Sequence, residues 1–130
     1  MKLSIGVFGS GRGSNFKSVL DKIKEGYLES EIKVVISNNS NAGILEIARL
    51  NNIPSYHISI KQFNSENEFN QKILDVLEKH SVDFILLAGY MKKIDSNIVN
   101  KYKNRILNIH PALIPSFCGQ GMYGLNVHKA

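Results

Sequence analysis

The sequence has few of the features that mark secreted, membrane or nucleic-acid-binding proteins. Its one cysteine, Cys118, cannot form an internal disulfide, which favours a reduced setting. No apolar run approaches a membrane span, and the opening MKLSIGVFGSGRGSN is too short and too broken by glycine for a signal peptide. The basic residues form no block, so the net charge of +5 suits small anions better than nucleic acid. We expect a cytoplasmic protein with neither a nucleic-acid nor a membrane partner.

Acidic residues are missing from the end of the chain, since no Asp or Glu follows Asp95. This shortage matters because the stretch LNIHPALIP, residues 107–115, places Asn108 and His110 two residues apart at the end of an apolar run. A histidine that moves protons needs a partner that orients its ring and supports its charge. The nearest acids fall at strand starts or on helices, at Glu78, Asp83 and Asp95.

What is present is an alternation of strand-like and helix-like segments in a chain large enough for one domain, residues 1–130. Apolar runs rich in β-branched residues predict strands over 3–8, 32–37, 55–59, 82–88 and 105–110. Helical spacing predicts helices over 15–26, 44–51 and 95–102. A further helix is predicted by a capping box at Ser65 and an apolar face that extends to Leu77. Such units predict an α/β fold with a doubly wound, mostly parallel sheet that binds ligands at the carboxyl ends of its strands.

The loop GSGRGSN, residues 9–15, is typical of an anion site. Its glycines let the backbone approach a ligand, and the amides that follow open a helix. Ser14 replaces the last glycine of a dinucleotide motif and no Gly-Lys-Ser/Thr follows, which favours a single phosphate. The alternative is an ordinary glycine-rich turn with Ser14 or Asn15 as helix cap. We expect Ser14→Pro or Gly13→Val to abolish nucleotide binding and leave the fold largely intact.

Two further loops complete the candidate site. In LAGYMKKI, residues 87–94, an apolar wall stands beside Lys92 and Lys93 and suits a flat ring with a carboxylate tail; the alternative is a tight turn with solvated lysines. Alternation along the fifth strand sends Asn108 and His110 to one side, where they could stabilise an oxyanion and move protons. A structural role is the alternative for His110, and the one we assign to His57 and His80.

The three segments resemble, in order and spacing, the phosphoribosylglycinamide formyltransferases of purine synthesis, from residue 2 to the last residue. The run NIHP followed by LIPSFCG is the most specific part. The resemblance implies transfer of a formyl group from 10-formyltetrahydrofolate, as co-substrate and without a metal, to the amino group of glycinamide ribonucleotide.

The resemblance also assigns roles to residues. It places the nucleotide phosphate on the amides of Gly13, Ser14 and Asn15 and makes Asn108 and His110 the catalytic pair. It places the folate against Met91, Lys92, Lys93, Ile94 and Asn108. Glu66 departs from the family, in which a basic folate contact is common at this point.

Family members continue for a C-terminal third that supplies the aspartate partner of the histidine. We therefore expect this chain to be a truncated N-terminal nucleotide-binding domain with negligible activity alone. The final NVHKA is typical of a helix start, and a fifth strand left as a bare edge predicts a homodimer. The alternatives are a formyltetrahydrofolate hydrolase, which Pro111 after His110 disfavours, and a phosphate-binding module without catalysis.

Overall fold

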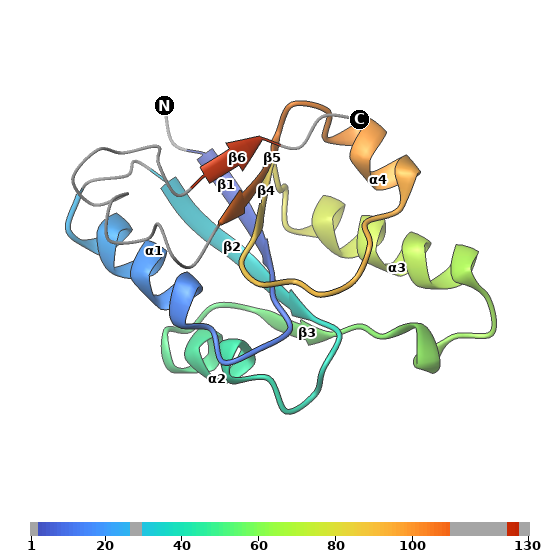
Figure 1. Ribbon diagram of the computed structural model, residues 1–130, viewed down its shortest axis with the longest axis horizontal. Helices are drawn as coiled ribbons and strands as arrows, with labels where there is room; N and C mark the ends of the chain where they lie inside the picture. Colours follow the sequence, from blue (N-terminus) through green and yellow to red (C-terminus); the bar gives the residue numbers. More distant parts are fainter. Residues whose placement is uncertain (1–2, 27–29, 110–124, 128–130) are drawn as a thin grey trace.

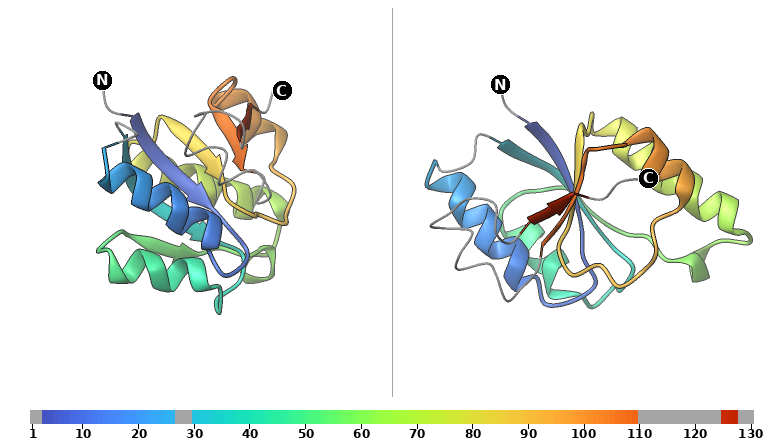
Figure 2. Two further views of the ribbon diagram at one scale, coloured as in Figure 1. Left: turned by 60° about the vertical axis from the view of Figure 1, so that its left-hand side comes forward. Right: turned by 45° about the horizontal axis from the view of Figure 1, so that its top comes forward.

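The computed structural model describes residues 3–26, 30–109 and 125–127. In Figure 1 and Figure 2, a sheet of six strands separates two pairs of helices. The strands are β1 (Leu3–Phe8), β2 (Ser30–Ser37), β3 (Ser55–His57), β4 (Phe84–Leu87), β5 (Ile106–Ile109) and β6 (Leu125–Val127). The helices are α1 (Ser14–Lys24), α2 (Gly43–Leu50), the short 3-10 helix η1 (Ile60–Gln62), α3 (Glu66–Lys79) and α4 (Ser96–Lys101).

The strand order is β3-β2-β1-β4-β5-β6, and β1 to β5 are parallel. The predicted doubly wound, mostly parallel sheet is therefore confirmed. From β1 the chain moves outward through β2 and β3, then returns to the other side of β1 to add β4 and β5. The order reverses between β1 and β4, and in such sheets ligands bind outside the carboxyl ends of the strands at this switch point.

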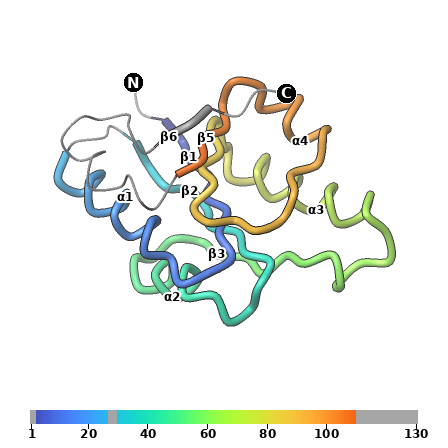
Figure 3. The backbone as a smooth tube through the Cα atoms, viewed as in Figure 1, coloured from blue at the N-terminus to red at the C-terminus, as the bar shows by residue number. Residues whose placement is uncertain are grey.

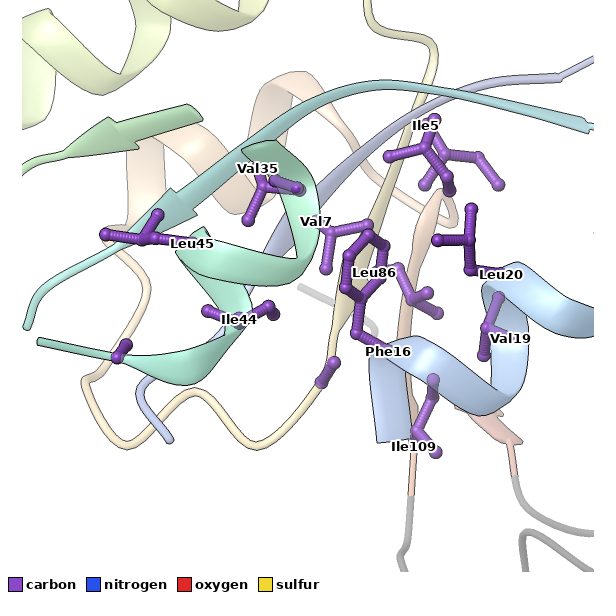
Figure 4. Packing of buried hydrophobic residues seen from close by; sticks show 14 residues of the cluster. Ile5, Val7, Phe16, Val19, Leu20, Val35, Ile44, Leu45, Leu86 and Ile109 are labelled. Atoms are coloured by element: carbon purple, nitrogen blue, oxygen red, sulfur yellow. The ribbon is translucent and has the colours of Figure 1, made fainter. Parts of the chain in front are cut away.

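Alternating side chains along the strands build one apolar core on each face of the sheet. Val7 and Leu86 belong to the core under α1 and α2, whereas the next residues, Phe8 and Leu87, belong to the core on the side of α3 and α4. Figure 4 shows Phe16 of α1 lying toward the sheet among the residues of the first core. Burial on both faces explains why the strands are almost continuously apolar.

Polar caps fix where α3 and α4 begin. The Ser65 hydroxyl accepts a hydrogen bond from the Glu68 amide at 3.2 Å, as predicted, but the Glu68 carboxylate accepts from the Asn64 amide at 3.1 Å rather than from Ser65. Asp95 caps α4 by accepting from the Asn97 amide at 3.0 Å. By contrast, α1 begins after Gly13 with no side-chain cap, and its first amides stay open to a ligand.

Two expectations about the C-terminal part of the sheet are wrong. β6 pairs antiparallel with β5, so β5 is not a bare edge, and Asn126 and Val127 lie in a strand instead of starting a helix. The pairing satisfies the backbone groups that β5 would otherwise leave open. Homodimer formation, which we expected from that open edge, stays a prediction with less support. β3 is also shorter than expected, because the Ser59 side chain caps η1.

Candidate functional site

The loop after β1 brings a row of open amides to the switch point. Gly13 lies at φ 86° just before α1, and within the described residues the amides of Gly13, Ser14 and Asn15 have no hydrogen-bond acceptor. Open amides at a helix N-terminus attract anions. They open onto a cavity of about 100 Å³, which is lined by Gly11, Arg12, Gly13, Ser14, Asn15, Ala88 and Gly89.

The shape of this loop depends on close packing against α2. The Gly11 carbonyl accepts a hydrogen bond from the Ile44 amide at 3.2 Å. A β carbon added at Gly43 would lie 2.6 Å from the Arg12 carbonyl oxygen, and one added at Gly13 would lie 2.8 Å from the Ile44 α carbon. Because contacts under 3.0 Å are not tolerated between real atoms, both positions need glycine for the backbones to approach.

The loop after β4 forms the opposite wall of the site. Gly89 adopts φ 74° and turns the chain away from the sheet. Tyr90 packs edge-on against Phe8 with ring centroids 5.3 Å apart, and burial raises the pKa of its phenol to about 12. Met91, the next residue, is 80% exposed and gives this wall an open apolar surface.

Lys92 and Lys93 line a groove that runs along the carboxyl edge of the sheet. Three adjoining cavities of about 560, 200 and 480 Å³ share walls there, and we call them together the lysine groove. Lys92 borders the cavities of 560 and 200 Å³. Lys93 and Glu66 both border the cavities of 200 and 480 Å³. Neither lysine forms an ion pair with another described residue. The lysine groove is therefore lined by three cations, Lys61, Lys92 and Lys93, and by two carboxylates, Glu66 and Asp95.

Asn108 lies near the carboxyl end of β5, half-buried, and pairs in register with Leu87 of β4 and Asn126 of β6. Neighbours in register share a face, so Asn108 lies on the α3 and α4 side, as Leu87 does. It is not among the residues that line the four cavities described above. His110 lies outside the described residues.

The three acidic residues that precede His110 most closely in the sequence each make another contact. The Glu78 carboxylate pairs with Lys101 at 3.2 Å, and Asp95 caps α4. Asp83 lies at the amino end of β4, where its carboxylate is 3.4 Å from the Ser4 amide. Because His110 lies outside the described residues, the expectation that these three residues are poor partners for it stays a prediction.

Two residues that sequence reasoning left without a role join the loops of the site. The Ser10 hydroxyl donates to the Asn38 side-chain oxygen at 2.5 Å and accepts from the Met91 amide at 2.8 Å. The Ser10 amide donates to the Gly89 carbonyl at 3.2 Å. Figure 3 traces the backbone through these loops after β1, β2 and β4. The only sequence signal was that Ser10 and Asn38 both follow strands.

The described residues hold neither a membrane-spanning helix nor a cluster of metal ligands. No helix there is both long and apolar enough to cross a lipid bilayer. Within the same ranges, no group of three or more His, Cys, Asp or Glu side chains is placed to hold a metal ion.

The chain has an α/β fold with a parallel sheet, and a cavity lined by the loops after β1 and β4 lies at its switch point. The chain belongs to the formyl transferase family, whose profile matches residues 3–130. It is 42% identical over 127 residues to a chloroplastic phosphoribosylglycinamide formyltransferase of Arabidopsis thaliana, covering 97% of this chain and 44% of the relative. It is 35% identical over 113 residues to the Bacillus subtilis phosphoribosylglycinamide formyltransferase, covering 87% of this chain and 58% of that one.

Solved structures agree with this assignment. The fold matches the phosphoribosylglycinamide formyltransferase of Coxiella burnetii with a TM-score of 0.82 and 31% identity, over 100% of this chain and 66% of that one. A formyltetrahydrofolate deformylase from Pseudomonas putida matches at a TM-score of 0.76 with 21% identity, over 85% of this chain and 38% of that one, which shows a shared fold only. The chain spans about half the length of the curated relatives it matches.

Proposed function

We propose that this chain is the nucleotide-binding part of a phosphoribosylglycinamide formyltransferase. In this proposal, glycinamide ribonucleotide binds with its phosphate on the amides of Gly13, Ser14 and Asn15. The observation that carries the proposal is the cavity at the switch point, where those amides have no acceptor among the described residues and Ala88 and Gly89 form the far wall. The similarity to phosphoribosylglycinamide formyltransferases over most of this chain supports the same conclusion.

The chemistry of transfer assigns different tasks to Asn108 and His110. The ribonucleotide amine forms a bond to the formyl carbon, whose oxygen becomes an oxyanion. Asn108 would donate a hydrogen bond to this oxygen, a contribution typically worth about a hundredfold or more in rate. When the bond from the formyl carbon to the folate nitrogen breaks, the amine has lost a proton and the folate nitrogen has gained one. His110 would carry that proton.

The residues of the lysine groove fit the co-substrate, 10-formyltetrahydrofolate, in part. Met91 gives an exposed apolar surface beside Lys92 and Lys93, and these cations, which form no ion pair with a described residue, suit a carboxylate tail. Glu66 borders the same groove and would repel a tail placed beside it. We therefore place the tail nearer Lys92, with Ile94 completing the folate contact. We also propose a cytoplasmic location, from the single cysteine.

A matched pair of charge changes tests the phosphate site. Asn15 is the second residue of α1 and lines the cavity, whereas Asn67 is the second residue of α3 and does not. An Asn→Asp change at either position suits the helix dipole and should leave the fold intact. Asn15→Asp places a carboxylate beside the phosphate, so we expect glycinamide ribonucleotide to bind at least about tenfold more weakly. Isothermal titration calorimetry measures the affinity.

Asn67→Asp should bind the ribonucleotide as the unmodified chain does. Equal affinity in all three proteins would remove this loop from the nucleotide site. Binding of the ribonucleotide also separates the proposal from a formyltetrahydrofolate hydrolase, which needs no nucleotide acceptor. If a protein extended by the family's C-terminal part binds the ribonucleotide but does not transfer the formyl group, the alternative of a phosphate-binding module without catalysis is favoured.

A further inference from the structure

Ser10 lies between the two halves of the proposed site. Its amide and hydroxyl join it to Gly89 and Met91 after β4, and its hydroxyl also donates to Asn38 after β2. Three residues further along the same loop, the Gly13 amide opens the phosphate cavity. One residue therefore contacts both the loop that would hold the nucleotide and the segment that would hold the folate.

The Met91–Ile94 segment has few other attachments. Among the described residues, the bond from the Met91 amide to the Ser10 hydroxyl is the only hydrogen bond joining its main chain to another element. Met91, Lys92 and Lys93 are all exposed. Ile94 is half-buried against the second core, so the part of the segment that lacks burial is residues 91–93, and its order depends on the Ser10 anchor.

The loop that carries Ser10 is anchored on its other side. The Gly9 amide donates to the Ile36 carbonyl at 3.0 Å, and the Gly11 carbonyl accepts from the Ile44 amide. An anion bound to the amides of Gly13, Ser14 and Asn15 would tighten this loop further. Ordering Ser10 would then order the Met91 amide, which lowers the entropy that a second ligand must remove.

We propose that Ser10 is a positioning residue that couples the two ligand sites, so that phosphate bound after β1 strengthens binding at Met91–Ile94. The proposal rests on the proposed function for the identity of the ligands. By linkage, the effect must be the same in both directions, and coupled sites typically change each other's affinity by about fivefold or more. Removing the hydroxyl should reduce this factor toward one.

The test compares Ser10→Ala with Ser10→Thr, which keeps a hydroxyl, and with Ser18→Ala, whose hydroxyl bonds within α1 to the Ser14 carbonyl. Glycinamide ribonucleotide is titrated into each protein with and without saturating folic acid. We expect the unmodified chain, Ser10→Thr and Ser18→Ala to bind about fivefold or more tightly when folic acid is present. Ser10→Ala should bind equally well in both cases.

Coupling that survives in Ser10→Ala, or that is absent from the unmodified chain although both ligands bind, would overturn the role of Ser10 and leave the proposed function intact. If neither ligand binds, the proposed function fails. The coupling is then tested by measuring hydrogen exchange of the Met91 amide in the presence and in the absence of inorganic phosphate. Phosphate that slows this exchange in the unmodified chain but not in Ser10→Ala supports it. An equal response in both proteins overturns it.

Discussion

Gly13 lies at a position with no room for a side chain. A β carbon there would lie 2.8 Å from the Ile44 α carbon and 2.9 Å from the end of the Ile47 side chain, and the backbone has φ 86°. Gly11, two residues earlier, has nothing within 4 Å of an added β carbon. The expectation that Gly13→Val leaves the fold intact is therefore wrong, because the valine would separate the loop from α2.

We predict that Gly13→Ala lowers the free energy of unfolding by more than about 2 kcal/mol. The left-handed backbone costs a non-glycine residue about 1–2 kcal/mol, and overpacking against α2 adds about 1–3 kcal/mol. Gly11→Ala should change stability by no more than about 0.5 kcal/mol. Urea unfolding of the two variants measures both values. Similar losses in both would show that the loop does not pack against α2 as described.

At the scale of an element, α3 ends in a contact that depends on protonation. His80 follows the helix, and its Nε2 atom lies 2.8 Å from the Tyr56 hydroxyl of β3. Burial and, to a lesser extent, the neighbouring Lys79 charge lower the pKa of His80 from its ordinary value of 6.5. The unfolded chain therefore takes up a proton at a higher pH than the folded chain does.

The consequence is a loss of stability on acidification. Well above pH 6.5, His80 is neutral in both the folded and the unfolded chain, and its contribution to the free energy of unfolding is constant. As the pH falls through 6.5, the unfolded chain protonates His80 before the folded chain does. The free energy of unfolding therefore falls until the pH is below the folded pKa as well. Replacement by His80→Gln should make the curve between about pH 5 and pH 7.5 flatter. Urea unfolding at a series of pH values measures this. If the free energy of unfolding of His80→Gln depends on pH as steeply as that of the unmodified chain, the contact between His80 and Tyr56 does not cause the pH dependence.

Elements with strong local patterns could be predicted from the sequence, and those that depend on distant partners could not. The apolar face of α3 and its Ser65 cap are readable within one turn or two, since both depend on neighbours in the chain. β6 has only three residues, and its pairing with β5 is a tertiary contact. Ser10 joins residues 28 and 81 positions away, which only the strand order brings together.

At the scale of the whole molecule, we predict that residues 1–130 bind glycinamide ribonucleotide and show negligible formyl transfer. The phosphate loop needs β1, α1 and the loop after β4, all present, whereas His110 has no acidic residue after it and the earlier candidates are engaged elsewhere. Without an acid partner, a histidine loses both its orientation and the stabilisation of its charged form. In comparable sites this loss lowers the catalytic rate by orders of magnitude.

The comparison protein joins this chain to the remaining part of the Bacillus subtilis relative, of which this chain covers 58%. Transfer from 10-formyltetrahydrofolate should be seen only with the joined protein, while calorimetry should give similar ribonucleotide affinities for both. Transfer by residues 1–130 at a rate close to that of the joined protein would mean that a residue within them supplies the acid.

The position of β1 in the middle of the sheet has a consequence for synthesis on the ribosome. β1 is made first, but β4, which pairs with its second edge, is complete only at Leu87, about eighty residues later. At synthesis rates of about 5–20 residues per second, that edge waits roughly 4 to 16 seconds. During this interval the nascent chain carries an unpaired apolar strand, which is a surface that chaperones bind and that neighbouring nascent chains can pair with.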